Sequence, residues 1–274
     1  MREFDFRQVD VFTAKRGRGN PLAVVHGAEN LSDAEMAAFA NWTNLSETAF
    51  LLAPTVPDAD YHVRIFTPTS ELAFAGHPTL GSCHAWLEAG GLPKGTEIVQ
   101  ECGVGLVRIK RDGPRLAFAA PPAEQRDVAP ELLPRIAAAL GISVGAIRAA
   151  RHLGKAPPWI GVLLGSRDEV LAVRPDYAAM AGLEIGIVAP STAEDAQFEV
   201  RGFTLDVGGE DPVTGSLNAG LARWLIGAGI APPRYVAAQG TCLGREGRIF
   251  VTQAGVDFWI GGHSLTCIAG RLRL

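Results

Sequence analysis

The chain contains the stretch His77-Pro78-Thr79-Leu80-Gly81-Ser82 and, 134 residues later, the stretch Asp211-Pro212-Val213-Thr214-Gly215-Ser216. The two stretches share proline, glycine and serine at matching places, and an apolar segment with helical spacing follows each of them. An offset close to half of the 274 residues indicates an internal repeat. We therefore expect two similar α+β halves that face each other across a cleft, each with strands around one buried helix.

The boundary between the halves is expected near residue 122. Pro121-Pro122 interrupts the alternating pattern, and residues 123–127 are polar enough to form a linker. We therefore predict an N-terminal half over residues 1–122 and a C-terminal half over residues 123–274.

Short alternating runs separated by glycine and proline predict many strands. Tyr61, Val63 and Ile65, for example, alternate with polar or aromatic neighbours, as in a half-buried strand. The capping-box spacing from Ser32 to Glu35 predicts a helix over residues 33–42. The two apolar helices of the repeat are expected near residues 78–89 and 213–226, and both should be buried.

The composition excludes several classes of protein. Hydrophobic residues make up 47% and charged residues 20% of the chain, which is typical of a globular protein. Lys and Arg number 25 against 29 Asp and Glu, so no nucleic-acid partner is expected. No apolar stretch approaches the about 20 residues of a membrane span, and the first residues lack the apolar run of a signal peptide. We expect a soluble, cytoplasmic protein without a membrane partner.

The four cysteines do not form a recognisable framework. Cys83, Cys102, Cys242 and Cys267 are widely spaced and contain no C-x-x-C pair. This spacing predicts neither a zinc site nor a set of disulfides. Reduced thiols agree with the expected cytoplasmic location.

The repeated helix starts are candidate binding elements. Gly76-His77 and the segment from Asp211 to Ser216 would each lie at the N-terminus of a buried helix. Free N–H groups and partial positive charge at such ends can hold a small anion such as a carboxylate. The alternative is ordinary capping, because Asp and Ser near a proline are common at helix starts.

Glu47 is the candidate acid/base. It precedes an apolar strand, where removal of water would raise the pKa of its carboxyl toward the range useful for proton transfer. The alternative is a surface carboxylate at the strand start. His77 could cap its helix or donate a hydrogen bond to substrate. His84 and Glu88 are spaced i,i+4, but no third ligand follows, so a helical hydrogen bond is expected rather than a metal site.

Most sequence signatures of enzymes are absent. The chain has no phosphate-binding loop, no G-x-G-x-x-G after a strand and no H-E-x-x-H. Residues 141–145 match G-x-S-x-G, but they follow an expected helix, whereas a nucleophile elbow follows a strand. These observations favour chemistry without a cofactor or metal.

Several blocks of the chain resemble the PhzF-like isomerase family of phenazine biosynthesis. The similar blocks are residues 9–12 (VDVF), 19–25 (GNPLAVV), 44–50 (NLSETAF), 64–68 (RIFTP), 71–81 (ELAFAGHPTLG) and 209–216 (GEDPVTGS), together with Gln239-Gly240, Gly244-Arg245, Gly247 and residues 260–262 near the end. The resemblance therefore covers nearly the whole chain.

The resemblance implies a diaminopimelate-epimerase-like α+β fold, in which a curved sheet or barrel surrounds a central helix in each half, and a homodimer. It also implies a cofactor-independent isomerase in which Glu47 moves a proton between two carbons of a small anionic metabolite, a dihydro-hydroxyanthranilate in the phenazine pathway. By the same resemblance, the substrate contacts are Gly76, His77, Asp211, Gly215 and Ser216.

Two alternatives stay open at this point. One is an epimerase acting on an amino-acid-like metabolite through Glu47, and the other is a metabolite-binding protein that has lost turnover. A racemase with two thiols is disfavoured, because the expected helix starts carry His77 and Asp211 rather than cysteines.

Overall fold

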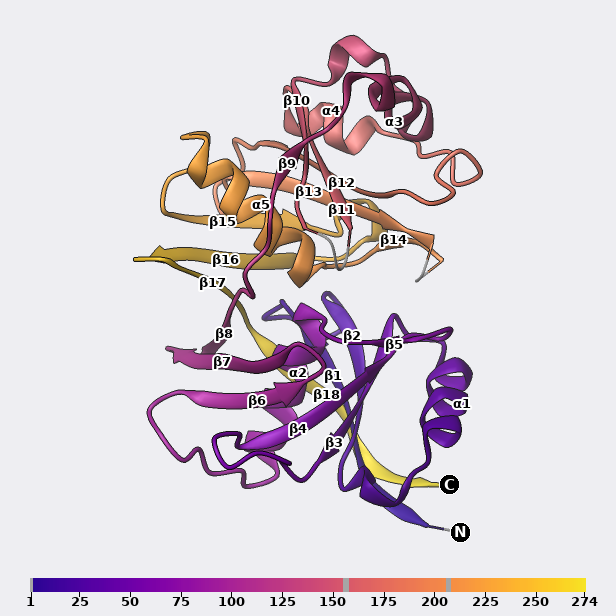
Figure 1. The fold of residues 1–274 in the computed structure, drawn as a ribbon, viewed down its shortest axis with the longest axis vertical. Coiled ribbons are helices and arrows are strands. Elements are labelled where there is room, and N and C mark those ends of the chain that lie inside the picture. Colours follow the sequence, from indigo (N-terminus) through magenta and orange to yellow (C-terminus); the bar gives the residue numbers. More distant parts are fainter. Residues whose placement is uncertain (1, 155–157, 206–207) are drawn as a thin grey trace. The chain divides into compact units, whose positions relative to one another are not determined.

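The computed structural model describes residues 2–154, 158–205 and 208–274 (Figure 1). The chain forms two compact units. Unit 1 extends to Ala119 and also contains Gly261–Leu274, whereas unit 2 is Ala120–Ile260. Within the described ranges, no helix has both the length and the apolar character that crossing a membrane requires.

Unit 1 is a mixed sheet around a buried helix, with a second helix on its outside. The strands pair in the order β18-β1-β2-β3-β4-β6-β7-β8, and β5 forms a hairpin with β4. The elements are β1 (Glu3–Val11), β2 (Asn20–Val25), α1 (Asp33–Thr43), β3 (Glu47–Leu52), β4 (Tyr61–Phe66), β5 (Glu71–Leu72), α2 (Gly76–Glu88), β6 (Ile98–Cys102), β7 (Gly105–Asp112), β8 (Arg115–Ala119), β18 (Ser264–Arg273) and the 3-10 turn Ala28–Asn30.

Unit 2 is built in the same way. Its strands pair in the order β9-β10-β11-β12-β13-β15-β16, and β14 forms a hairpin with β13. The elements are β9 (Arg126–Asp127), α3 (Leu133–Leu140), β10 (Ala149–His152), β11 (Trp159–Leu163), α4 (Arg167–Ala172), β12 (Glu184–Pro190), β13 (Phe198–Thr204), β14 (Gly209–Asp211), α5 (Gly215–Gly227), β15 (Arg234–Gln239), β16 (Gly247–Ala254), β17 (Asp257–Gly262) and the 3-10 turns Pro130–Leu132, Val144–Ala146 and Thr241–Leu243.

The internal repeat is present in the strand pairing. From β1 to β7 in unit 1, successive neighbours pair antiparallel, parallel, antiparallel, parallel and antiparallel. From β10 to β16 in unit 2, the same five pairings occur in the same order. In each unit the central helix follows the short hairpin strand and precedes a strand that returns parallel to an earlier one.

The two central helices lie close against their strands. Both helices are 13 residues long, and the sixth residue of each is a glycine, Gly81 in α2 and Gly220 in α5. A Cβ atom on Gly81 would lie 2.6 Å from Cδ2 of Leu22, and one on Gly220 would lie 2.7 Å from Cβ of Leu153. Since real Cβ atoms do not approach so closely, only glycine fits at this point of either helix.

The register of the predicted repeat is wrong by five residues. The helices begin at Gly76 and Gly215, an offset of 139, so His77 corresponds to Ser216 and not to Asp211. Asp211 is the last residue of β14, four residues before α5 begins. The Gly-Ser pair misled the alignment, because it lies inside α2 as Gly81-Ser82 but opens α5 as Gly215-Ser216.

The last 14 residues pack with unit 1, although the predicted C-terminal half extends to residue 274. β18 pairs antiparallel with β1 along its whole length, from Glu3 opposite Arg273 to Val11 opposite Ser264. This pairing joins the two ends of the chain, and nothing local in the sequence signals it. The other limit of unit 2, before Ala120, lies close to the predicted boundary at 122/123.

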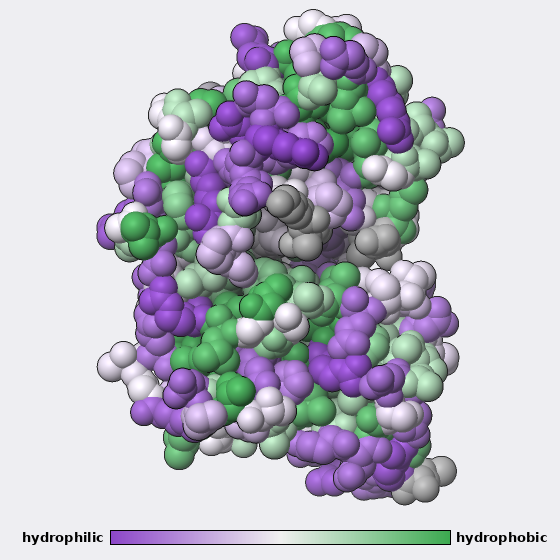
Figure 2. All heavy atoms as spheres, in the orientation of Figure 1, coloured by the Kyte–Doolittle hydropathy of each residue, from purple (hydrophilic) through white to green (hydrophobic). Residues whose placement is uncertain are grey.

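Outer helices cover the second face of each sheet. In unit 1, Met36 and Phe39 of α1 pack on Phe50 and Phe66, and the capping box from Ser32 to Glu35 is formed as predicted. In unit 2, α3 and α4 pack on alternate residues of β11 and β12. Figure 2 shows a surface on which hydrophilic and hydrophobic residues are mixed.

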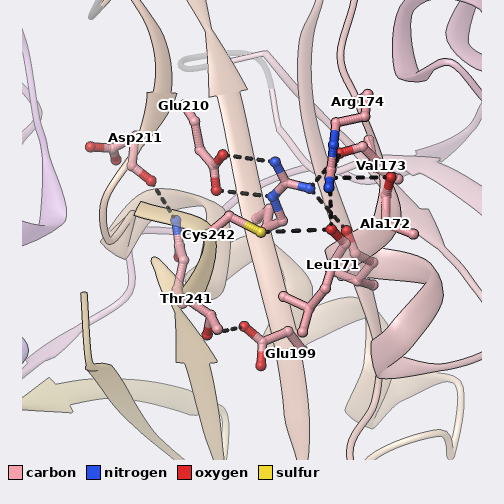
Figure 3. A network of polar contacts seen from close by, with 12 residues as sticks. Leu171, Ala172, Val173, Arg174, Glu199, Glu210, Asp211, Thr241 and Cys242 are labelled. Atoms are coloured by element: carbon pink, nitrogen blue, oxygen red, sulfur yellow. Dashed lines mark hydrogen bonds and ion pairs between the residues drawn. The ribbon is translucent and has the colours of Figure 1, made fainter. Parts of the chain in front are cut away.

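One arginine in each unit links strand, hairpin and outer helix. Arg64 binds Glu71 in a bidentate pair, lies over the ring of Phe66 and donates to Asp33 of α1. Arg201 repeats this arrangement with Glu210, with the ring of Phe203 and with the carbonyls of Val170 and Val173 (Figure 3). The Arg201–Glu210 side chains are only 4% and 6% exposed, whereas those of Arg64 and Glu71 are 22% and 43% exposed.

This difference in burial predicts different stabilities for matched variants. Glu210→Gln leaves a buried guanidinium without its carboxylate and should lower the free energy of unfolding by roughly 3 kcal/mol. Glu71→Gln removes an exposed pair and should lower it by at most about 1 kcal/mol. Urea denaturation of both variants measures the two values. Equal losses would show that burial does not set the strength of this repeated contact.

Candidate active site

Glu47 and His77 lie next to each other in unit 1. Glu47 is the first residue of β3, opposite Leu22 of the parallel strand β2. Its Oε2 lies 3.4 Å from Nε2 of His77. Glu47 is 8% and His77 2% exposed, so the carboxyl is not at the surface and both groups are separated from bulk water.

His77 is the second residue of α2 and is held in its neutral form. Burial lowers the pKa of His77 to about 3, against an opposing contribution from the Pro21 carbonyl. On its other side, Nδ1 of the ring lies 3.3 Å from Nδ2 of Asn20. Gly76, the first residue of α2, is also buried, and no side chain caps the helix at Ala75. The structure therefore brings Gly76, His77 and Glu47 together.

Asp211 belongs to a buried polar network in unit 2. It is 5% exposed, and its Oδ2 accepts a hydrogen bond of 2.5 Å from Oγ1 of Thr214. Gln239 binds both residues, because its Nε2 donates to Oγ1 of Thr214 and to the carbonyl of Asp211. Asn218 of α5 donates to Oε1 of Gln239. Asp211 is thus fixed beside the start of α5, although it is not part of that helix.

Gly215 and Ser216 open α5. Gly215 is buried, and Oγ of Ser216 accepts a hydrogen bond of 3.1 Å from Nε1 of Trp159. The N-cap residue is Thr214, and its side chain makes no capping bond. Neither Asp211 nor Ser216 occupies the N-cap position, so ordinary capping does not explain them.

No role was predicted for two buried glutamines, Gln100 and Gln239. Each binds the fourth residue of the central helix of its unit. Gln100 donates to Oγ1 of Thr79 at 3.1 Å, and Asn218 donates to Gln239 at 2.9 Å. Their separation of 139 residues equals that of the helix starts, which is a signal that the correct register of the repeat could have given. The glutamines fix the first turn of each helix relative to the strands.

Other candidate sites do not form. The G-x-S-x-G match lies after α3 in a turn that contains Val144–Ala146 and follows no strand, as predicted. His84 pairs with Glu88 at 3.2 Å along α2. Over the described ranges, no three His, Cys, Asp or Glu residues are grouped so that they could hold a metal ion.

The buried His77 should make stability depend on pH. Its folded pKa of about 3 lies below the unfolded value of 6.5, so protonation favours the unfolded chain. Stability is therefore lost as the pH falls below 6.5, and this loss ends near the folded pKa. Between pH 7 and pH 5 the contribution of His77 amounts to about 2 kcal/mol. His77→Gln should lose that much less than wild type in urea denaturation at the two pH values. Parallel losses in both proteins would contradict a neutral, buried His77.

Comparison with known proteins identifies the relatives of this chain. The family described as phenazine biosynthesis-like protein (PhzC-PhzF) matches residues 9–270. Antisense-enhancing sequence 1 of Schizosaccharomyces pombe is 36% identical, with 99% of each chain covered. An uncharacterized isomerase of Pseudomonas aeruginosa is 31% identical, also with 99% of each chain covered.

The solved structures confirm the fold. The crystal structure of a PhzF-family phenazine biosynthesis protein from Bacillus anthracis has a TM-score of 0.85 at 21% identity, with 100% of both chains covered. A probable proline racemase from Agrobacterium radiobacter has a TM-score of 0.63 at 15% identity, with 99% of this chain and 93% of that chain covered. The predicted diaminopimelate-epimerase-like α+β fold is therefore correct. The chain belongs to the family of phenazine biosynthesis-like proteins and is an isomerase.

Proposed function

We propose that the protein moves a proton between two carbons of a small carboxylate-bearing substrate, similar to a dihydro-hydroxyanthranilate, with Glu47 as its single acid/base. The observation that carries this proposal is the buried carboxyl of Glu47 beside the neutral imidazole of His77. A buried carboxyl next to a fixed polar partner suits proton transfer, because water cannot compete for the proton.

In this reaction Glu47 acts twice. Its carboxylate takes a proton from one carbon and forms the carboxylic acid, and the acid then returns a proton to a second carbon of the same substrate. The net charge of substrate and enzyme is unchanged over the cycle, so the reaction needs no external oxidant, reductant or cofactor. The cofactor-free mechanism and the homodimer implied by the resemblance stay predictions.

The uncapped helix starts support recognition of an anion. The N-cap residues Ala75 and Thr214 make no side-chain capping bond, which supports donation by the first N–H groups of α2 and α5 to a substrate carboxylate. We propose that Gly76 and Gly215 supply backbone donors, and that His77, Asp211 and Ser216 contact polar groups of the substrate. Asp211 suits an amine or hydroxyl, since a carboxylate accepts from such donors.

Deuterium exchange separates this function from the alternatives. The protein is incubated in D₂O with 2,3-dihydro-3-hydroxyanthranilate and, separately, with L-proline, and the products are followed by NMR. Isomerisation gives a product in which a carbon different from the one deprotonated carries the added proton. It is H where Glu47 returns the proton that it took and D where that proton first exchanges with solvent, and either result supports the proposal. Deuterium returned to the same carbon with inversion indicates an epimerase. Binding of either compound with neither a new product nor deuterium exchange indicates a protein that binds but does not turn over.

Glu47→Gln tests the acid/base directly. The amide has nearly the same shape but cannot titrate, so activity should fall by about 10²- to 10⁴-fold. Ligand affinity and the urea midpoint should stay close to wild type, and Glu47→Asp should keep part of the activity. Glu101→Gln, an exposed carboxyl of the same unit bound to Thr55, is the matched control and should be fully active. Wild-type turnover by Glu47→Gln would assign the base to another residue.

Ser216→Ala and Asp211→Asn test the contribution of unit 2. Ser216→Ala removes the acceptor for Trp159 and should cost about 1 kcal/mol of stability. In both variants the loss of substrate binding free energy, measured by calorimetry on the folded protein, should exceed the loss in the free energy of unfolding. A lower unfolding midpoint with unchanged affinity would leave these residues with a structural role only.

A further inference from the structure

The two nitrogens of the His77 ring have different neighbours. Nδ1 lies 3.3 Å from the side-chain nitrogen of Asn20, and Nε2 lies 3.4 Å from Oε2 of Glu47. Asn20 is 0%, His77 2% and Glu47 8% exposed. The Pro21 carbonyl is a further neighbour of the ring. With bulk water excluded, these three neighbours determine which ring nitrogen carries the proton.

The chemistry of the asparagine decides between the two tautomers. An amide nitrogen only donates, so Nδ1 of the imidazole accepts from Asn20. A neutral imidazole carries its proton on the other nitrogen, and burial keeps His77 neutral near pH 7. The proton is therefore assigned to Nε2, which lies 3.4 Å from Oε2 of Glu47, although the two atoms form no hydrogen bond in this structure.

We propose that Asn20 is a positioning residue that fixes His77 as the Nε2–H tautomer and so places a hydrogen-bond donor beside Oε2 of Glu47. This inference rests on the proposed role of Glu47 as the acid/base. A small shift of the two side chains on substrate binding would bring this donor into hydrogen-bond geometry with the carboxylate. The bond would then stabilise the carboxylate and orient it for proton abstraction.

The backbone around Asn20 is itself held in place. Asn20 is the first residue of β2, opposite Val11 of β1. The Asp10 carboxylate accepts from the N–H groups of Arg18 and Gly19 at 2.9 and 3.0 Å. A Cβ atom on Gly19 would lie 2.2 Å from the carbonyl oxygen of Val11, so this turn requires glycine. This turn therefore holds Asn20 in a fixed position beside the His77 ring.

Nitrogen-15 NMR of the histidine-labelled wild-type protein at pH 7 tests the tautomer without any substrate. We expect His77, assigned by comparison with His77→Gln, to show a protonated Nε2 and an unprotonated Nδ1. A proton on Nδ1, as donation to the Pro21 carbonyl would require, overturns the proposal. Because this result does not depend on turnover, it is separate from the test of Glu47 itself.

Asn20→Asp replaces the hydrogen-bond donor beside Nδ1 of His77 by an acceptor. A carboxylate only accepts, so the proton should move to Nδ1 and the donor beside Glu47 should be lost. We expect kcat to fall by about 10- to 100-fold. Asn41→Asp, in which an exposed amide that donates to the Pro68 carbonyl is changed in the same way, is the matched control and should keep the wild-type spectrum and rate.

Asn20→Leu offers neither donor nor acceptor and covers the case in which a buried aspartate prevents folding. This variant should show a mixture of the two tautomers and a reduced kcat. A wild-type tautomer in either folded Asn20 variant would overturn the positioning role. Loss of activity in Glu47→Gln together with an unchanged tautomer in Asn20→Asp would support the proposed function while rejecting this inference.

Discussion

The structure depends on a close approach between a buried helix and the inner face of a mixed sheet, made once in each unit. Gly81 and Gly220 allow this approach, since any side chain there would overlap Leu22 or Leu153. Because each helix is enclosed, its first turn is fixed by buried partners, such as Gln100 for Thr79. Helix ends that solvent does not satisfy are available to bind a ligand. Under the proposed function, the packing constraint thus produces the binding element.

The repeat places different chemistry at equivalent points of the two units. The first residue of β3 is Glu47, opposite Leu22, and the first residue of β12 is Glu184, opposite Trp159. At the second helix position, unit 1 has a histidine, whereas unit 2 has Ser216 bound to the indole of Trp159. The pair of a carboxyl and an imidazole therefore occurs in unit 1, and the equivalent place in unit 2 presents a hydroxyl.

Much of the fold could be predicted from local patterns in the sequence. The capping box at Ser32 predicted α1, and the mostly apolar helices predicted burial of α2 and α5. The burial of Glu47 also agrees with its place before an apolar strand. Pairings between distant segments left no such pattern, which is why β18 was expected in the second half, although it pairs with β1. The contact between Asn20 and His77 was missed for the same reason, since 57 residues separate the two in the sequence.

Glu210 of unit 2 and Glu47 of unit 1 are buried carboxylates with different neighbours. Arg201 and Glu210 are buried as a complete bidentate pair, in which each charge has an opposite partner. Such a pair can be part of a stable core, because the cost of desolvation is offset within the pair. Glu47, in contrast, faces an imidazole that burial keeps neutral, so this contact is not an ion pair. Under the proposed function, the exclusion of bulk water around Glu47 keeps solvent from competing for the proton that it transfers, which a surface glutamate could not achieve.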